Sequence, residues 1–239
     1  MNPIVTDRLT KVFKEKPAVD ELTLEVEKGS IFGFLGPNGA GKSTTIRMLC
    51  GILKQTSGSA YVGGYSIDKD PEKIKSIIGY MSQRFSLYDD LTVRENLKFY
   101  SQLYGLTKRQ IMENIVIILD RMKIKEYRDY LSKNLSGGLR QRLALGCALS
   151  HDPEIIFLDE PTAGVDPVTR KEFWDLIREI ADSGKTFFIT THYIEEAEKC
   201  DKLGFMFSGK LIASGSPVEL KKNGDTLEAV FVKLMKEYV

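Results

Sequence analysis

The sequence GPNGAGKST, residues 36–44, decides the fold of this chain. It satisfies the pattern G-x-x-x-x-G-K-[ST], follows the apolar run IFGFL, and leads into the helical stretch TIRMLCG. In that context, small residues allow consecutive backbone N–H groups to surround phosphates at a helix N-terminus, whose dipole favours anions. We therefore expect an α/β fold that binds a nucleotide through a strand, a loop and a helix.

Every residue of this loop is expected to contribute to the phosphate site. Lys42 places a positive charge on the phosphates, and the hydroxyl of Ser43 can ligate Mg²⁺. A glycine-rich turn beside an exposed lysine is the plainer alternative, which the strand before the loop and the helix after it disfavour. The expected nucleotide-binding residues are Gly36, Pro37, Asn38, Gly39, Ala40, Gly41, Lys42, Ser43 and Thr44.

Two adjacent carboxylates follow a second apolar strand. Asp159 ends the run IIFLD, which places it at the C-terminal edge of a sheet beside the phosphate loop. We expect Asp159 to hold Mg²⁺ through water, and Glu160 to accept a proton from attacking water. A solvated loop is the alternative, which the four apolar residues before Asp159 disfavour.

The order of the remaining segments indicates a parallel sheet. LTLEVEKG alternates like a half-buried strand, whereas EIIFLD and TFFIT, residues 154–159 and 186–190, are typical of buried strands. A helix with an apolar side separates the last two. Strand, helix and strand in this order predict parallel pairing with a right-handed crossover. The apolar side carries Phe173, Trp174, Ile177 and Ile180.

The middle of the chain, from Arg84 to His151, is predicted to be a helical insertion. Thr92 with Glu95, and Thr107 with Gln110, have the spacing of capping boxes, and each pair opens an amphipathic segment. The second segment presents one apolar face to the core. That face consists of Ile111, Ile115, Ile118, Leu119 and Met122.

Length and composition narrow the class of protein. With 239 residues, 42% of them hydrophobic, the chain can bury a sizeable core. Lys and Arg number 34 against 33 Asp and Glu, which disfavours nucleic acid or an anionic membrane as a direct partner. Three separated cysteines without CxxC spacing argue against disulfides and zinc, and favour the cytoplasm. Neither a signal peptide nor a run of about 18 apolar residues is present, so we expect no membrane span.

The stretch NLSGGLRQR, residues 134–142, opens a further helix. Ser136 suits the N-cap, because its hydroxyl can accept a hydrogen bond from an N–H of the first turn. Gly137 and Gly138 cost backbone entropy without adding a side-chain contact. We therefore expect main chain without side chains to have a function at the start of this helix. A purely structural glycine-rich cap is the alternative.

These stretches, with further short motifs, resemble the ATP-binding subunit of an ABC transporter over essentially the whole chain. GPNGAGKST, YMSQ, LSGG, IIFLDEPT, AGVD and TTH follow one another in the family's order. TAGVDPVTRKEFW and THYIEEAEKCD also resemble the ATPases of two-component, multidrug or ABC-2 type exporters. The resemblance implies an α/β P-loop NTPase core with a mostly parallel sheet, an antiparallel β subdomain near the N-terminus and an inserted α-helical subdomain.

The same resemblance implies a single ABC ATPase domain over residues 1–239. Its RecA-like core and β subdomain would comprise residues 1–83 and 152–239. The helical subdomain, with the signature motif, would comprise about residues 84–151.

The resemblance also implies roles for residues outside the phosphate loop. Phe13 stands where the family stacks an aromatic ring on adenine, and Val19 where it adds an apolar contact; a core position is the alternative for Phe13. Gln83 resembles the residue that touches Mg²⁺ and the attacking water. His192 resembles the switch residue at the γ-phosphate, with a structural histidine as the alternative.

In this family two ATPase domains pack head to tail, so the LSGG stretch lies over the nucleotide of the other copy. Ser136, Gly137 and Gly138 would then form a second anion site in trans, and Asp166 would lie at the shared interface. Leu139 departs from the family's usual glutamine and cannot form a side-chain hydrogen bond. That departure puts a side-chain contact to the partner's nucleotide, and a capping box with Ser136, in question.

The implied cofactors are ATP and Mg²⁺, and the implied partners are a second ATPase subunit, in a homodimer, and transmembrane permease subunits. The permease would dock near Phe85, Leu87 and Tyr88, which are equally compatible with packed core, and would hold the chain on the cytoplasmic face of the membrane. One rival function is a soluble ABC ATPase acting on nucleic acid or ribosomes, which the near-neutral charge and the lack of sustained heptads disfavour. Another is a nucleotide-binding regulator without turnover, which would lack the carboxylate or the histidine.

Overall fold

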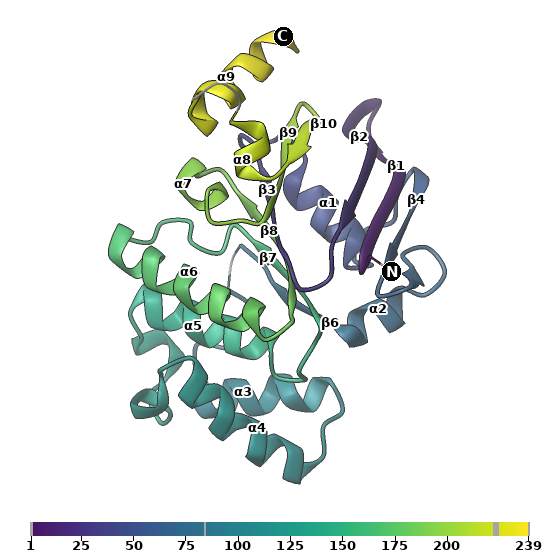
Figure 1. Cartoon of the computed structure of the whole chain (residues 1–239). Helices are drawn as coiled ribbons and strands as arrows, with labels where there is room; N and C mark the ends of the chain where they lie inside the picture. The colour runs from purple at the N-terminus through teal and green to yellow at the C-terminus, as the bar shows by residue number, and fades with distance from the viewer. Residues whose placement is uncertain (1, 84, 222–224, 239) are drawn as a thin grey trace.

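A mixed six-stranded sheet forms the centre of the computed structural model, which describes residues 2–83, 85–221 and 225–238 (Figure 1). Its strands lie in the order β10-β9-β3-β8-β7-β6, and each neighbouring pair is parallel except β10 with β9. The mostly parallel sheet that the sequence predicts is therefore confirmed. The strands are β3 (Ile31–Leu35), β6 (Ile78–Met81), β7 (Ile155–Asp159), β8 (Thr186–Thr191), β9 (Lys202–Phe207) and β10 (Lys210–Gly215).

A second sheet, built near the N-terminus, is antiparallel throughout and has the order β2-β1-β4-β5. This sheet confirms the predicted antiparallel β subdomain. Helix α1 lies between it and the central sheet in Figure 1. The bounds are β1 (Ile4–Phe13), β2 (Lys16–Val26), β4 (Ser57–Val62), β5 (Tyr65–Ser66) and α1 (Lys42–Leu49).

Helices α3, α4 and α5 gather at one end of the molecule, with α6 alongside α5 (Figure 1). The bounds are α2 (Pro71–Ile77), α3 (Val93–Leu103), α4 (Lys108–Arg121), α5 (Gly137–Ala148), α6 (Pro167–Asp182), α7 (Ile194–Ala197), α8 (Pro217–Leu220) and α9 (Leu227–Glu237), with 3₁₀ turns η1 (Lys125–Tyr127) and η2 (Ser132–Asn134).

Apolar side chains divide between the two faces of the central sheet because successive residues of a strand point in opposite directions. In β3, Ile31 and Leu35 join the hydrophobic cluster that includes α3 to α6, whereas Phe32 and Phe34 join the cluster shared with α1 and the N-terminal sheet. The buried run IFGFL therefore supplies both cores. Such a strand has no polar face, which explains its uninterrupted apolar sequence.

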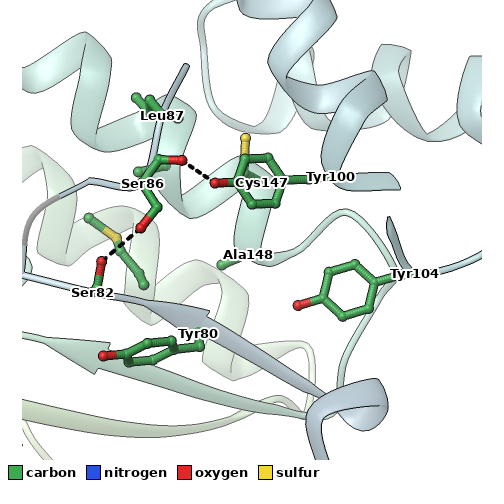
Figure 2. A pocket seen from close by; sticks show the side chains of 10 residues that line it. Tyr80, Ser82, Ser86, Leu87, Tyr100, Tyr104, Cys147 and Ala148 are labelled. Atoms are coloured by element: carbon green, nitrogen blue, oxygen red, sulfur yellow. Dashed lines mark hydrogen bonds between the residues drawn. The ribbon is translucent and has the colours of Figure 1, made fainter. Parts of the chain in front are cut away.

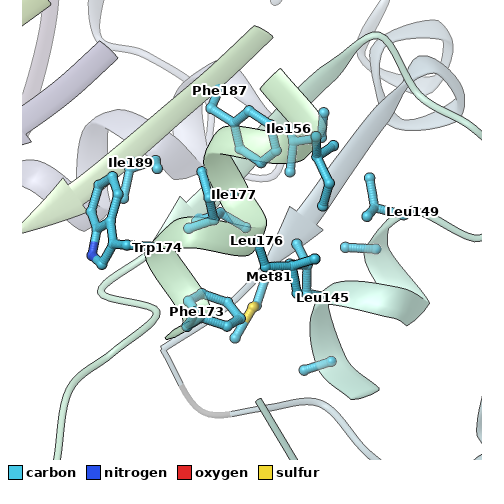
Figure 3. Packing of buried hydrophobic residues seen from close by; sticks show 14 of the residues in the cluster. Met81, Leu145, Leu149, Ile156, Phe173, Trp174, Leu176, Ile177, Phe187 and Ile189 are labelled. Carbon is cyan, nitrogen blue, oxygen red and sulfur yellow. The ribbon is translucent and has the colours of Figure 1, made fainter. Parts of the chain in front are cut away.

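The helical segment packs against the sheet through one continuous cluster. Figure 3 shows Trp174 of α6 beside Ile189 of β8 and Ile177 of α6 beside Phe187 of β8, with Leu145 of α5 and Met81 of β6 nearby. Both predicted capping boxes are present, at Thr92–Glu95 and Thr107–Gln110, and the predicted apolar face of α4 is buried. Arg84, where the sequence places the start of the insertion, lies outside the described residues.

Candidate nucleotide and catalytic site

The phosphate loop joins β3 to α1 at the C-terminal edge of the central sheet. Gly41 precedes the helix with a φ of 108°, which residues carrying a Cβ rarely adopt. A Cβ at Gly41 would also overlap the carbonyl oxygen of Ala18 in β2. The backbone conformation and the close carbonyl group therefore require glycine at this position. The absence of a side chain also leaves the helix N-terminus accessible to an anion.

Lys42 is nearly buried beneath this loop, with 4% of the residue exposed. Its Nζ donates to the carbonyl oxygens of Gly36 at 2.7 Å and Pro37 at 3.1 Å, and lies 3.2 Å from Oε1 of Glu160. An ammonium group has three N–H donors, and these acceptors match that number. The positive charge is thus fixed where the loop meets the helix.

Asp159 lies at the end of β7, beside the phosphate loop as the sequence predicts. Its Oδ1 accepts from Ser43 Oγ at 3.0 Å and from Thr190 Oγ1 at 2.7 Å. A hydroxyl and a carboxylate side by side are oxygen ligands of the kind that Mg²⁺ takes, usually with phosphates and waters completing its shell. Ser43 and Asp159 therefore fit a magnesium ion chemically.

The Glu160 carboxylate contacts other charged and polar groups of the site. Its Oε2 accepts from Gln83 Nε2 at 3.2 Å and lies 3.2 Å from Nδ1 of His192, while Oε1 faces Lys42. The residue is 7% exposed. Residues from three separated segments therefore converge on one carboxylate, as a general base with positioning partners requires.

Thr190 is a residue that the sequence reasoning missed. Its hydroxyl donates to Asp159 and accepts from the backbone N–H of Glu160 at 3.0 Å, so it holds both carboxylate residues. A threonine at the end of a buried strand is an ordinary β-former. The one available signal was its position next to the TTH motif, at the sheet edge where ligands bind.

A cleft of about 290 Å³ opens over these groups. Phosphate-loop residues line it, together with Gln83 and Glu160, two of the three predicted catalytic residues. The lining consists of Ala18, Asn38, Gly39, Gly41, Lys42, Ser43, Thr44, Gln83 and Glu160.

The two residues predicted to contact adenine behave differently. Phe13, at the end of β1, is 48% exposed, with Lys11 Nζ 5.1 Å from its ring centroid. It is therefore available for stacking and is not a core residue. The prediction for Val19 is wrong: its side chain is fully buried between the two sheets, and its neighbour Ala18 lines the cleft instead, because side chains alternate along β2.

The signature stretch begins α5 as predicted. Ser136 is the N-cap and accepts from the N–H of Leu139 at 3.4 Å. A Cβ at Gly138 would overlap Cγ2 of Thr169 in α6, whereas Gly137 has open space around it. Packing within the chain thus requires a glycine at position 138, whereas no neighbour among the described residues requires one at position 137. Leu139 forms no capping box; its side chain packs against the core.

Asp166 caps the N-terminus of α6. Its carboxylate accepts from the N–H groups of Val168 at 3.1 Å and Thr169 at 3.0 Å. The Thr169 side chain, then these backbone bonds, hold the pKa of Asp166 below its usual range. Within the described part of the chain, no hydrogen bond joins Asp166 or Ser136 to the phosphate loop.

A small pocket of about 200 Å³ lies where β6 leads into the helical segment (Figure 2). Tyr80, Ser86 and Tyr100 line it, and the Tyr100 hydroxyl donates to the carbonyl oxygen of Ser86. Burial raises the pKa of Tyr80 and of Tyr100 to about 12, so both hydroxyls stay protonated. Of the three residues expected near the permease, Phe85 and Leu87 pack against the core, and Tyr88 is half exposed.

Of the helices in the described ranges, none combines the length and the apolar character that crossing a lipid bilayer requires.

Comparison with known proteins identifies the family to which this fold belongs. Residues 19–163 match the family model described as ABC transporter. The chain belongs to the ABC transporter family. The prediction of an ATP-binding cassette is therefore confirmed.

Relatives of this ABC cassette are similar over nearly its whole length. The probable multidrug ABC transporter ATP-binding protein YbhF of Escherichia coli is 45% identical over 98% of the chain, which spans 42% of that relative. The linearmycin resistance ATP-binding protein LnrL of Bacillus subtilis is 37% identical over 97% of the chain and 75% of the relative. A solved dimeric bacterial ABC transporter cassette shares 25% identity and superposes with a TM-score of 0.81, over 89% of this chain and 98% of that one.

Proposed function

We propose that the chain is the ATP-hydrolysing subunit of an ABC exporter and that two copies hydrolyse two ATP molecules between them. The observation that carries the proposal is the convergence of Lys42, Gln83 and His192 on Glu160, next to the Ser43–Asp159 pair. Export is supported by relatives named for multidrug transport and linearmycin resistance. Those names also favour a transporter over an ATPase acting on nucleic acid or ribosomes.

Nucleotide binding would use the whole cleft. The adenine would stack on Phe13, and the phosphates would lie against the loop of residues 36–44 and Lys42. Ser43 and Asp159, with Gln83, would hold Mg²⁺. The metal ion supplies charge neutralisation of the phosphates when it is bound.

These residues would promote hydrolysis mainly by positioning the reactants and stabilising charge, because phosphoryl transfer involves little covalent chemistry by the protein. A water oxygen bonds to the γ-phosphorus, the bond to the bridging oxygen of ADP breaks, and a water proton moves to the Glu160 carboxylate. Gln83 and His192 hold that carboxylate in place. Lys42 stabilises negative charge on the phosphate oxygens.

The second half of each site would come from the partner copy. Ser136 and the amides of Gly137 and Gly138 begin α5 and would bind the γ-phosphate in trans, with Asp166 nearby at the interface. The open space around Gly137 supports this role, because no contact among the described residues requires a glycine there. The dimeric cassette among the similar structures supports the pairing.

The single ABC domain of residues 1–239 would dock on a membrane permease through its helical subdomain, about residues 84–151. The continuous hydrophobic cluster between this subdomain and the sheet supports one domain. We place the permease near Phe85, Leu87 and Tyr88, beside the pocket that follows Gln83. This association would hold the chain on the cytoplasmic face of the membrane.

Phosphate release by the purified chain at saturating ATP tests the proposal. The rate per chain should rise with chain concentration and then level off, because a complete site needs two copies, and chelation of divalent cations should abolish it. A strictly monomeric preparation that hydrolyses ATP as fast as a paired one would contradict the shared site.

A further inference from the structure

Glu196 is a carboxylate buried away from the candidate site. It lies on α7, four residues after His192, and is only 1% exposed. Glutamate is rarely buried unless it is paired, because the charged form loses its hydration. Its partners therefore indicate what it does.

Both oxygens of this carboxylate accept hydrogen bonds from threonines that flank residues of the site. Oε2 accepts from Thr191 Oγ1 at 2.6 Å, and Oε1 accepts from Thr162 Oγ1. Thr162 lies two residues after Glu160, and Thr191 directly precedes His192. Along β8, Thr190 bonds the catalytic carboxylates while Thr191 points to Glu196, as strand alternation dictates.

Arg170 of α6 completes the cluster. Its Nε lies 3.6 Å from Glu196 Oε1, and its Nη2 donates to the carbonyl oxygen of Val165 at 3.2 Å. Its guanidinium also lies over the Tyr193 ring, 3.9 Å from the centroid, and that ring is 4.1 Å from the His192 ring. The loop before Asp166 is thus fastened at both ends to the segment that carries His192.

We propose that Glu196 is a positioning residue that makes the loop of residues 161–166 and the segment of residues 191–193 move as one unit. This inference rests on the proposed function, in which Asp166 lies at the interface with the partner copy and His192 holds the Glu160 carboxylate in place. Arrival of the partner at Asp166 then adjusts His192 and Glu160 through Thr162, Glu196 and Thr191. Glu196 acts through these residues and does not touch the reacting atoms.

The first test is Glu196→Gln, with Glu195→Gln as the matched control because Glu195 is adjacent and exposed. An amide cannot accept from both threonines and pair with Arg170 as a carboxylate does. Glu196→Gln should lower kcat about tenfold. It should leave KM for ATP and the affinity for a fluorescent ATP analogue within about twofold, because the phosphate loop is untouched. Glu195→Gln should match the wild type.

A double-mutant cycle separates positioning from a general loss of stability. If Glu196 acts through His192, the variant His192→Ala with Glu196→Gln should be no slower than His192→Ala alone. The inference would be overturned if the double variant lost kcat by the product of the two single losses. It would also be overturned if the kcat of Glu196→Gln equalled that of the wild type. Absence of turnover in the paired wild type would instead refute the proposed function.

Thr191 provides a second route if Glu196→Gln does not fold. Thr191→Val keeps the shape and removes the donor to Glu196, whereas Thr191→Ser keeps the hydroxyl. Thr191→Val should reproduce the fall in kcat at constant KM, and Thr191→Ser should restore most of it. Equal rates for the two variants would overturn the inference.

Discussion

Glu160 is held in a backbone conformation that residues other than glycine seldom adopt, with a φ of 47°. Such conformations persist where the surrounding contacts over-determine them. Here the N–H is bound by Thr190, and the carboxylate contacts Lys42, Gln83 and His192. The side chain is therefore preorganised before any substrate arrives.

Replacement of Glu160 by glutamine tests its role as the base. The amide cannot take a proton, so turnover should fall by at least about 100-fold, while ATP binding persists because the phosphate loop is intact. The pair should remain closed around ATP, which size-exclusion chromatography with and without nucleotide would detect. Glu154→Gln, at an exposed ion pair with Lys28, is the control. Undiminished turnover would exclude Glu160 as the base.

For single residues, the sequence predicts those whose chemistry is unusual at their position. Lys42 stands out through the phosphate-loop pattern, and Asp159 and Glu160 stand out because charged groups rarely end a buried strand without a function. Thr190 does not, since threonine is common in strands. Ala18 and Val19 differ by one position, and only the three-dimensional path of β2 decides which of them faces the cleft.

Among the elements, α5 and α6 approach each other so closely that Gly138 touches Thr169. We expect Gly138→Ala to lower the free energy of unfolding by about 1–3 kcal/mol through overpacking, and Gly137→Ala to change it by less than about 0.5 kcal/mol. Adding Thr169→Ser removes the obstructing methyl group and should recover most of the loss. Equal stabilities of the two alanine variants in urea unfolding would refute this packing role.

His151 joins the helical segment to the central sheet. Its ring stacks on Tyr104, with centroids 3.4 Å apart, and its Nε2 lies 3.0 Å from the carbonyl oxygen of Ile78 in β6. Burial lowers its pKa to about 4. The neutral form of the ring is therefore favoured at this junction over the protonated form.

A pH dependence of stability follows from that lowered pKa. Because the unfolded chain has a His pKa of about 6.5, it binds more protons in this window, and the free energy of unfolding should fall as the pH drops from about 6.5 towards about 4. Solvent screening at this partly buried residue limits the loss to about 2 kcal/mol or less. In urea unfolding, His151→Phe should show a smaller fall than the wild type. Parallel curves for His151→Phe and the wild type would contradict the assignment.

The elements themselves were largely predictable from local patterns. The capping boxes at Thr92 and Thr107, the apolar face of α4 and the buried strands β7 and β8 all follow from spacing and periodicity. The contact between Gly138 and α6 could not be predicted in this way. It depends on how two helices cross, which a single-chain pattern does not contain.

For the whole molecule, the proposed trans site makes two inactive variants complementary. Lys42→Ala removes the phosphate-loop charge, and Ser136→Ala removes the signature hydroxyl. In a mixed pair, one site combines an intact loop with an intact signature stretch. Mixing the two variants should therefore restore up to about half of the wild-type rate per mixed pair, since one of its two sites is complete.

Two mixtures decide the outcome. Lys42→Ala mixed with a chain carrying both substitutions contains no complete site and should remain inactive. If Lys42→Ala with Ser136→Ala is equally inactive although the chains exchange, the two residues belong to one site within a single chain.

The strand order has a consequence for biosynthesis. Both neighbours of β3 in its sheet, β8 and β9, begin at or after residue 186 of the 239 residues. Until that part of the chain leaves the ribosome, IFGFL has no strand partner and exposes an apolar edge suited to aggregation. The nascent phosphate loop therefore stays unsupported for most of translation, and a ribosome that stalls before β8 would release a chain unable to assemble its nucleotide site.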